Sequence, residues 1–261
     1  MNILIAPFVN ALFGFYNLTG NLGWAVVIVT VLIRLLLIPL VLPSLRSAKK
    51  MAELQPKLKA LKQKWGSDKE KLAKAQMDLY KEEGINPLSG CLPQIAQIAV
   101  LIIFFSAFNT VSNYSIGKGT LEEMNSYLVP ALQINESFKF DVGFLGSVLS
   151  ETPAQVFAKG FSELWVLPFI LLVGSGVLQY FSAKLMMPEP KLDQKIVKKT
   201  EDKEDDMMSM MRTQSLYMMP AMTVFIGWSF SLGMLLYWFV NSGTMLVQQL
   251  VVGKMDKGAK S

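Results

Sequence analysis

Residues 22–42 read LGWAVVIVTVLIRLLLIPLVL, and Arg34 is the one charged side chain in this run. As an α-helix the run covers roughly 30 Å, the thickness of the hydrocarbon core of a membrane. A lone cation at that depth costs about 3 kcal/mol on insertion scales. Because no carboxylate shares the run, water, a polar cavity or a transient guest must compensate Arg34. This arginine is therefore the first candidate functional residue.

The chain is too apolar for an ordinary soluble domain, since 52% of its 261 residues are hydrophobic and its mean hydropathy is +0.37. Five segments are long and apolar enough to cross a membrane as helices. We expect an all-α integral membrane protein, a five-transmembrane-helix bundle with spans at residues 21–43, 88–112, 164–183, 215–232 and 233–252. The last two segments nearly touch, which predicts a tight helical hairpin with Gly233 near its turn.

Basic residues are distributed unevenly among the segments between the spans. Residues 43–87 carry eleven Lys and Arg against six acids, whereas residues 112–163 carry three against six. Residues 184–214 carry seven of each, and the tail from 253 carries three basic residues and one acid. Because basic loops stay in the cytoplasm, we expect the N-terminus outside and the C-terminus in the cytoplasm or its topological equivalent.

The first 33 residues carry no charged side chain, and they lack the basic start and cleavage site of a secretory signal. Ile3, Phe8, Leu12 and Phe15 recur at near-helical spacing. This pattern predicts that residues 1–20 form an amphipathic interfacial segment on the outer face. A second interpretation stays open, in which the segment is an apolar leader that packs on the bundle.

The chain contains one cysteine, Cys91, and no histidine. A disulfide within the chain is therefore excluded, as are metal sites and catalytic triads based on histidine. Cys91 stands beside Leu92-Pro93 at an expected helix start, which favours a small packing residue over a nucleophile. We expect no metal, no cofactor and no enzymatic activity.

Residues 44–87 predict a basic helical hairpin on the cytoplasmic side. The apolar face of its first helix has the spacing i, i+4, i+7, i+11: Leu54, Leu58, Leu61 and Trp65. Gly66 ends that helix, and residues 67–70 (SDKE) have the form of a capping box that starts a second helix. The two helices should pack antiparallel.

The lysines of this hairpin allow two interpretations. One is a solvated face near anionic lipid that sets the topology. The other is a recruitment surface that contacts a ribosome or RNA. Because no stacking aromatics are interleaved, sequence-specific nucleic-acid binding is not expected. The candidate recruitment residues are Lys57, Lys59, Lys62, Lys64 and Lys69.

The remaining segments carry less information. Residues 113–163 predict a polar external loop with a short helix. Residues 184–214 predict a charged, flexible cytoplasmic loop, because the part from Pro188 to Asp206 is dense in charge and flanked by proline. Residues 253–261 form a short basic cytoplasmic tail.

Polar residues recur inside the expected spans. Thr30 lies one helical turn before Arg34, so both side chains face the same way. If the polar faces of the spans converge, the bundle encloses a hydrophilic groove open to the cytoplasm. The alternative is that the amides are interhelical hydrogen-bond partners and that Arg34 snorkels to the surface. The other candidate groove residues are Gln97, Gln179, Tyr237, Trp238 and Asn241.

Four stretches, spread in order over most of the chain, resemble the YidC membrane-protein insertase family, which has mitochondrial and chloroplast relatives. They are residues 22–34 with Thr30 and Arg34, residues 54–61 (LQPKLKAL), residues 79–93 (LYKEEGINPLSGCLP) and residues 236–249 from Leu-Tyr-Trp to Gln-Gln. The resemblance implies that Arg34, Thr30, Gln97, Gln179, Tyr237 and Trp238 occupy the family's groove positions.

The resemblance also implies a mechanism. Short hydrophilic segments of client proteins enter the positively charged groove, and their apolar segments are released into the bilayer. The protein would act as an insertase, translocation factor and chaperone whose partners are nascent membrane proteins and lipids, with a ribosome and a Sec-type translocon as further candidates. A small-molecule substrate is not implied. The short tail after Gln249 is only modestly basic, which leaves the hairpin as the expected ribosome contact.

Two other functional classes compete with the insertase. One is a channel or transporter that uses Arg34 to select an anion, although ion transporters commonly bury carboxylates or histidines and these spans contain neither. The other is a structural subunit of a larger assembly. Flux in empty liposomes would identify the transporter, and tolerance of Arg34→Ala would identify the scaffold.

Overall fold

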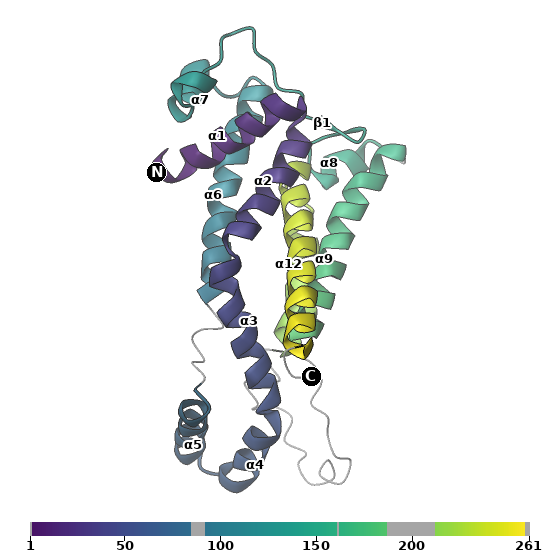
Figure 1. Ribbon diagram of the computed structural model, residues 1–261. Helices are drawn as coiled ribbons and strands as arrows, with labels where there is room; N and C mark the ends of the chain where they lie inside the picture. The colour runs from purple at the N-terminus through teal and green to yellow at the C-terminus, as the bar shows by residue number, and fades with distance from the viewer. Residues whose placement is uncertain (1, 85–91, 161, 187–211, 259–261) are drawn as a thin grey trace.

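The computed structural model describes residues 2–84, 92–160, 162–186 and 212–258 (Figure 1). Residues 85–91, which include Cys91 and about half of the 79–93 motif, lie outside the described residues, as do the charged part of the predicted 184–214 loop and the end of the tail. Three helices are long and apolar enough to cross a membrane: α6 (Leu92–Ser115), α9 (Val166–Met186) and α12 (Leu232–Gly258). Helices α9 and α12 pack side by side, and α6 lies across α2 (Leu22–Leu36) from them in the view of Figure 1.

A fourth candidate span is bent. Helices α2 (Leu22–Leu36) and α3 (Ile38–Glu53) are together long and apolar enough to cross a membrane, but they meet at 61° across Leu37. Pro39 explains the bend, because it has no N–H to donate to the carbonyl of Leu35 and its ring crowds that turn. The predicted span boundary at residue 43 is not a helix end, since α3 continues through Pro43 toward the hairpin.

The predicted span at 215–232 is a shorter, irregular helix. A π-helix, η5 (Gln214–Met218), leads into α11 (Met219–Gly227), which packs against α9. The turn before α12 lies at residues 228–231, and Gly233, which was predicted near the turn, is the second residue of α12. A Cβ atom at Gly233 would come within 2.0 Å of the Phe108 ring.

Helix α1 (Asn2–Thr19) packs against α2, α6 and α7. Of the residues predicted to share its apolar face, Leu12 is buried together with Ile5 and Val9, whereas Ile3 is 87% exposed. The helix carries no charge and is apolar on nearly every side, so periodicity alone does not identify the packed face.

Residues 116–160 fold into a cap over one end of the bundle, where a polar loop with a short helix was predicted. The cap contains α7 (Leu121–Tyr127), η2 (Pro130–Leu132), the antiparallel pair β1 (Gly143–Phe144) and β2 (Ser147–Val148), and α8 (Pro153–Ala158). Its aromatic core joins α1, since Phe13 and Tyr16 contact Phe138 and Phe140 with centroids 5.0–6.0 Å apart. The buried aromatic residues of this cap are scattered along the sequence and show no helical period.

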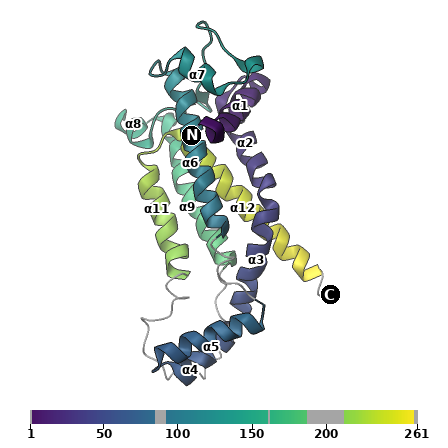
Figure 2. The ribbon, with the colours of Figure 1, turned by 90° about the vertical axis from the view of Figure 1, so that its left-hand side faces the viewer.

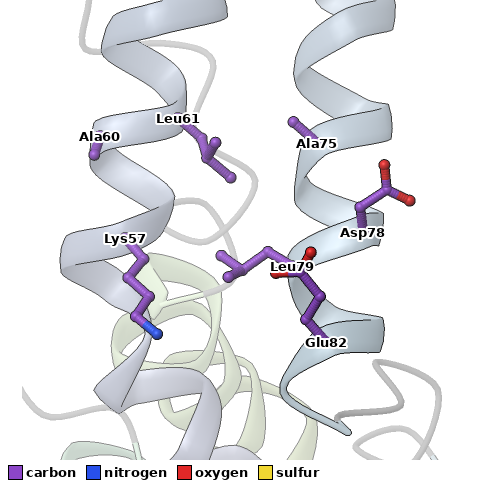
Figure 3. A pocket seen from close by; sticks show the side chains of 7 residues that line it. All are labelled: Lys57, Ala60, Leu61, Ala75, Asp78, Leu79 and Glu82. Carbon is purple, nitrogen blue, oxygen red and sulfur yellow. The ribbon is translucent and has the colours of Figure 1, made fainter.

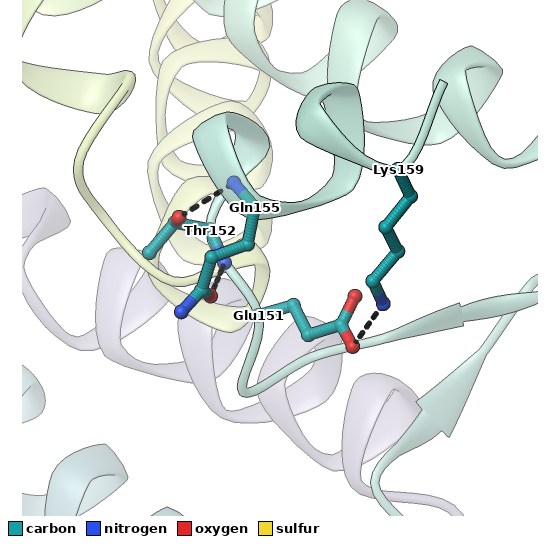
Figure 4. A network of polar contacts seen from close by, with 4 residues as sticks. All are labelled: Glu151, Thr152, Gln155 and Lys159. Carbon is teal, nitrogen blue, oxygen red and sulfur yellow. Dashed lines mark hydrogen bonds and ion pairs between the residues drawn. The ribbon is translucent and has the colours of Figure 1, made fainter. Parts of the chain in front are cut away.

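A helix capping box and an ion pair stabilise the second half of the cap. Thr152 and Gln155 form a capping box at the start of α8, and Lys159 pairs with Glu151 at 2.6 Å (Figure 4). The carbonyl oxygens of Glu151 and Leu149 accept hydrogen bonds from the backbone N–H groups of Leu232 and Gly233 at 2.7 and 2.9 Å. These bonds satisfy donors at the start of α12 that have no partner within the helix.

The turn between β1 and β2 stores backbone strain. Leu145 has φ 48° and is 72% exposed, and the next residue is Gly146 with φ 82°. A left-handed conformation costs a leucine about 1–2 kcal/mol, whereas Asn-Gly is the preferred pair in a two-residue turn of this kind. We expect Leu145→Asn to raise stability by about 1 kcal/mol, measured as a higher thermal midpoint in detergent. Leu145→Ala is the control, because it removes the exposed side chain and keeps the strain; an equal gain from alanine would contradict this explanation.

Helices α4 (Gln55–Trp65) and α5 (Lys69–Glu82) form a hairpin at the end opposite the cap (Figure 2). Buried Leu54 and Leu58 pack against Leu79 and Tyr80. Between the helices lies a cavity of about 390 Å³, into which Leu61 and Leu79 point from opposite sides (Figure 3). The first helix ends at Gly66 as predicted, but the N-cap of the second is Asp68 and not Ser67.

The Asp68 cap predicts a pH response. Its carboxylate accepts from the Lys71 N–H, and hydrogen bonding to Lys71 holds the pKa of Asp68 below its ordinary value of 3.8. A lowered pKa in the folded state means that the stabilisation is complete above pH 3.8 and is lost as the pH falls through the lowered value. We expect the protection factor of the Lys71 amide, the intrinsic exchange rate divided by the observed rate at the same pH, to fall in Asp68→Ala, and in the wild type on acidification. Asp68→Asn should keep the protection factor at all pH values, and an acid-sensitive protection factor in that variant would disprove the assignment.

Candidate functional site

Arg34 lies in the last turn of α2, three residues before the bend at Leu37, and is only 5% exposed. Its Nε donates a hydrogen bond to Oδ1 of Asn241 on α12 at 2.5 Å. Asn241 is itself 8% exposed. Within the described residues Arg34 forms no ion pair, so a neutral amide binds the guanidinium and leaves its charge uncancelled.

A second contact from α12 reaches the backbone of the same residue. Gln248 Nε2 donates to the carbonyl oxygen of Arg34 at 3.2 Å. In a continuous helix that oxygen would accept from the N–H of residue 38, but the helix breaks at Leu37. Gln248 therefore satisfies a carbonyl that the bend exposes, and it ties the bend to α12.

Tyr237 and Gln97 extend this polar cluster to α6. Gln97 Nε2 donates to the Tyr237 hydroxyl at 3.1 Å. The Tyr237 ring is buried and stacks on Phe104 with centroids 4.2 Å apart. Because Tyr237, Asn241 and Gln248 recur at four and seven residues, they share one face of α12. We call Arg34, Gln97, Tyr237, Asn241 and Gln248 the Arg34 cluster.

Three of the predicted site residues have other partners. Thr30 is buried, but its hydroxyl donates to the Val26 carbonyl at 2.6 Å within its own helix. Gln179 accepts from Thr223 at 2.8 Å and so joins α9 to α11. Trp238 is partly buried with its ring 5.8 Å from that of Phe230. Gln248 was not among the predicted site residues, although its seven-residue spacing from Asn241 placed it on the same face.

The predicted groove is not outlined by the two cavities that the structure describes. One is the hairpin cavity, and the other, about 240 Å³, lies between α1 and residues 131–138 of the cap. Neither is lined by Arg34.

Several hairpin lysines are engaged within the hairpin itself. Lys57 pairs with Glu83, which links the start of α4 to the end of α5. The ammonium groups of Lys64 and Lys71 lie 5.3 and 5.7 Å from the centre of the Trp65 ring. Lys62 is partly buried and Lys69 is exposed, while the side chain of Lys59 is outside the described part. These contacts stiffen the hairpin and leave the recruitment role a prediction.

Comparison with known proteins supplies the family. The model of the family described as 60Kd inner membrane protein matches residues 14–259. A membrane protein insertase YidC from Fusobacterium nucleatum is 30% identical over 240 residues, which are 92% of this chain and 89% of the relative. The YidC of Rickettsia bellii is 29% identical over 259 residues, 98% of this chain but 39% of that protein. The YidC of Bordetella petrii is 43% identical over 105 residues, 40% of this chain and 19% of that protein.

These matches confirm the resemblance that the four sequence stretches indicated. The chain spans most of the Fusobacterium relative and about two fifths of the length of the Rickettsia relative. All three relatives carry the name insertase.

Proposed function

The chain belongs to the 60Kd inner membrane protein family, whose matched relatives are named YidC insertases, and from this membership we propose that it inserts client proteins into the plasma membrane. A short hydrophilic segment of the client enters the bundle near Arg34, and the adjoining apolar segment then passes into lipid. The released apolar surface drives the process, since its transfer from water to hydrocarbon is favourable. The protein acts without a cofactor and also as a chaperone of the inserting segment.

The observation that carries this proposal is the buried, uncancelled charge of Arg34. Burying a cation without a counter-charge is costly, and a residue that serves packing alone would not need to be charged. Asn241 supplies a hydrogen bond and no charge, so the attraction for a client carboxylate is kept. The Gln97–Tyr237 pair adds polar atoms beside the same helix, which supports a hydrated groove open to the cytoplasm.

The proposed orientation places the α4–α5 hairpin and the C-terminus in the cytoplasm and the cap outside. Five spans result if the bent pair α2–α3 and the short helix from Arg212 to Gly227 both cross. The distribution of basic residues supports this orientation. The lysine-rich hairpin would then recruit a ribosome, a Sec-type translocon or anionic lipid, and the cap would close the outer end.

Site-specific crosslinking tests the proposal. A photoreactive amino acid is placed at Met245, one turn after Asn241 on the face of the Arg34 cluster, and a single-span client with an acidic tail is translated onto the membranes. Val247 is the matched control, because it lies two residues further on the opposite face of α12 and is exposed. We expect a client adduct at 245 that weakens in Arg34→Ala. Equal adducts at both positions, or an adduct at 245 that is unchanged in Arg34→Ala, would contradict a client groove at Arg34. Solute flux without a client would indicate a transporter.

A further inference from the structure

Helix α12 bonds Arg34 at two atoms, the side-chain Nε and the backbone carbonyl oxygen. We propose that Asn241 is a positioning residue that fixes the Arg34 guanidinium so that its Nη1–Nη2 edge takes one client carboxylate end-on, with two parallel hydrogen bonds. The inference rests on the proposed function, in which Arg34 attracts a client carboxylate, and adds the residue that orients the arginine and the edge on which the carboxylate binds.

The donor count of arginine supports the end-on mode. A guanidinium offers one N–H on Nε and two on each Nη, arranged in a rigid plane. A carboxylate can bind along the Nε–Nη edge or along the Nη1–Nη2 edge. Because Asn241 Oδ1 already accepts from Nε at 2.5 Å, the first edge is blocked. In the described chain no hydrogen bond uses the Nη groups, so the second edge is the one left for a ligand.

The surroundings hold Asn241 and Arg34 in register. Asn241 is nine-tenths buried, and one turn earlier Tyr237 is fixed by stacking on Phe104 and by Gln97. On the other side Gln248 bonds the Arg34 carbonyl. Both the backbone and the side chain of Arg34 are therefore anchored to α12, and the ordering of a long, flexible side chain is complete before the client arrives.

The identity of residue 241 matters for charge as well as for geometry. An asparagine accepts the Nε–H without neutralising the arginine. An aspartate at this position would keep the acceptor and add a negative charge beside the guanidinium. Asn241→Ala therefore removes orientation and keeps the charge, while Asn241→Asp keeps orientation and cancels the charge.

A double-mutant cycle tests the proposal, with the insertion rate of an acidic-tail client as the readout. Lysine cannot form the planar two-bond contact, so we expect Arg34→Lys to lower the rate about fivefold. Asn241→Ala alone should lower it by a similar factor of about five, and the double variant should be no slower than either single variant. Multiplying losses, about 25-fold in the double variant, would show that the two residues act independently and would overturn the proposal.

A second set of measurements varies the charge of the client tail. Changing its tail carboxylates to amides should abolish the effect of every variant at positions 34 and 241. If Asn241→Ala still slows the amide client, the occupant of the Nη edge is not a client carboxylate, and a lipid phosphate becomes the assignment. Asn241→Asp should match Arg34→Ala on the acidic client, and normal insertion by this variant would contradict the proposal.

Controls separate this inference from the proposed function and from misfolding. Asn109→Ala removes an asparagine from α6 outside the Arg34 cluster and should insert at the wild-type rate. Thermal midpoints in detergent show whether each variant is folded, and Asn241→Leu, which keeps the side-chain volume and removes the acceptor, stands in if the alanine variant is not. If Arg34→Ala inserts the acidic client normally, the proposed function fails. If Arg34→Ala is impaired and Asn241→Ala is normal, only the positioning role fails.

Discussion

Arg34→Glu is expected to slow insertion of an acidic-tail client by about thirtyfold, corresponding to ~2 kcal/mol, the low end for breaking a desolvated charge pair. The substitution replaces attraction by repulsion at a site where burial limits screening. It also takes the Nε donor away from Asn241. The rate is measured by protease protection of a client synthesised on proteoliposomes containing equal amounts of each folded variant.

The charge-swapped client provides the decisive control. A tail in which the acids are replaced by lysines should insert poorly with the wild-type protein and recover with Arg34→Glu. Recovery would show that the client tail interacts electrostatically with the residue at position 34. If the variant slows acidic, neutral and basic clients alike, Arg34 supports the fold and does not attract the client.

Gly233→Ala is expected to destabilise the bundle by about 3 kcal/mol, the upper part of the range for overpacking a core. The added Cβ would lie 2.0 Å from Cζ of Phe108, which is fully buried and stacked on Phe104. The backbone cannot easily retreat, because the Gly233 N–H is bonded to the Leu149 carbonyl in the cap. The measurement is the thermal unfolding midpoint in detergent.

Gly243 offers a matched control on the same helix. The nearest atom to a Cβ there is Leu178 Cδ1 at 3.7 Å, an ordinary contact. Gly243→Ala should therefore be neutral or stabilising by up to about 1 kcal/mol, because alanine is the better helix former. In a Phe108→Ala background, Gly233→Ala should lower the midpoint by less than it does in the wild type, because the ring that the new Cβ meets is absent. Equal midpoints for the two glycine variants would refute the packing argument.

The sequence was sufficient for features that depend on neighbouring residues. Hydropathy located α6, α9 and α12 to within several residues, and helical spacing put Tyr237 and Asn241 on one face of α12. Gly66 marked the end of the first hairpin helix. The charge of Arg34 inside an apolar run identified the centre of the candidate site, because the cost of burying a charge does not depend on the details of the fold. The family was recognisable from motifs alone.

Other local features were present in the sequence but were missed or assigned to a neighbouring residue. Pro39 explains the bend at Leu37, which the prediction of a span at residues 21–43 did not anticipate; the span itself stays a prediction. Asp68 is the N-cap of α5 where the capping-box pattern indicated Ser67. Almost all residues of α1 are apolar, so its helical period is weak and does not show which face packs on the bundle.

The tertiary structure alone decided which distant residues meet. Arg34 and Asn241 are 207 positions apart, and Arg34 and Gln248 are 214 apart, so no local pattern pairs them. The same holds for Gly233 against Phe108, and for the aromatic core that turns residues 116–160 into a cap. Helical periodicity indicates which side chains share a face, but the neighbour that covers that face is selected by packing, which depends on the shapes of all the helices together.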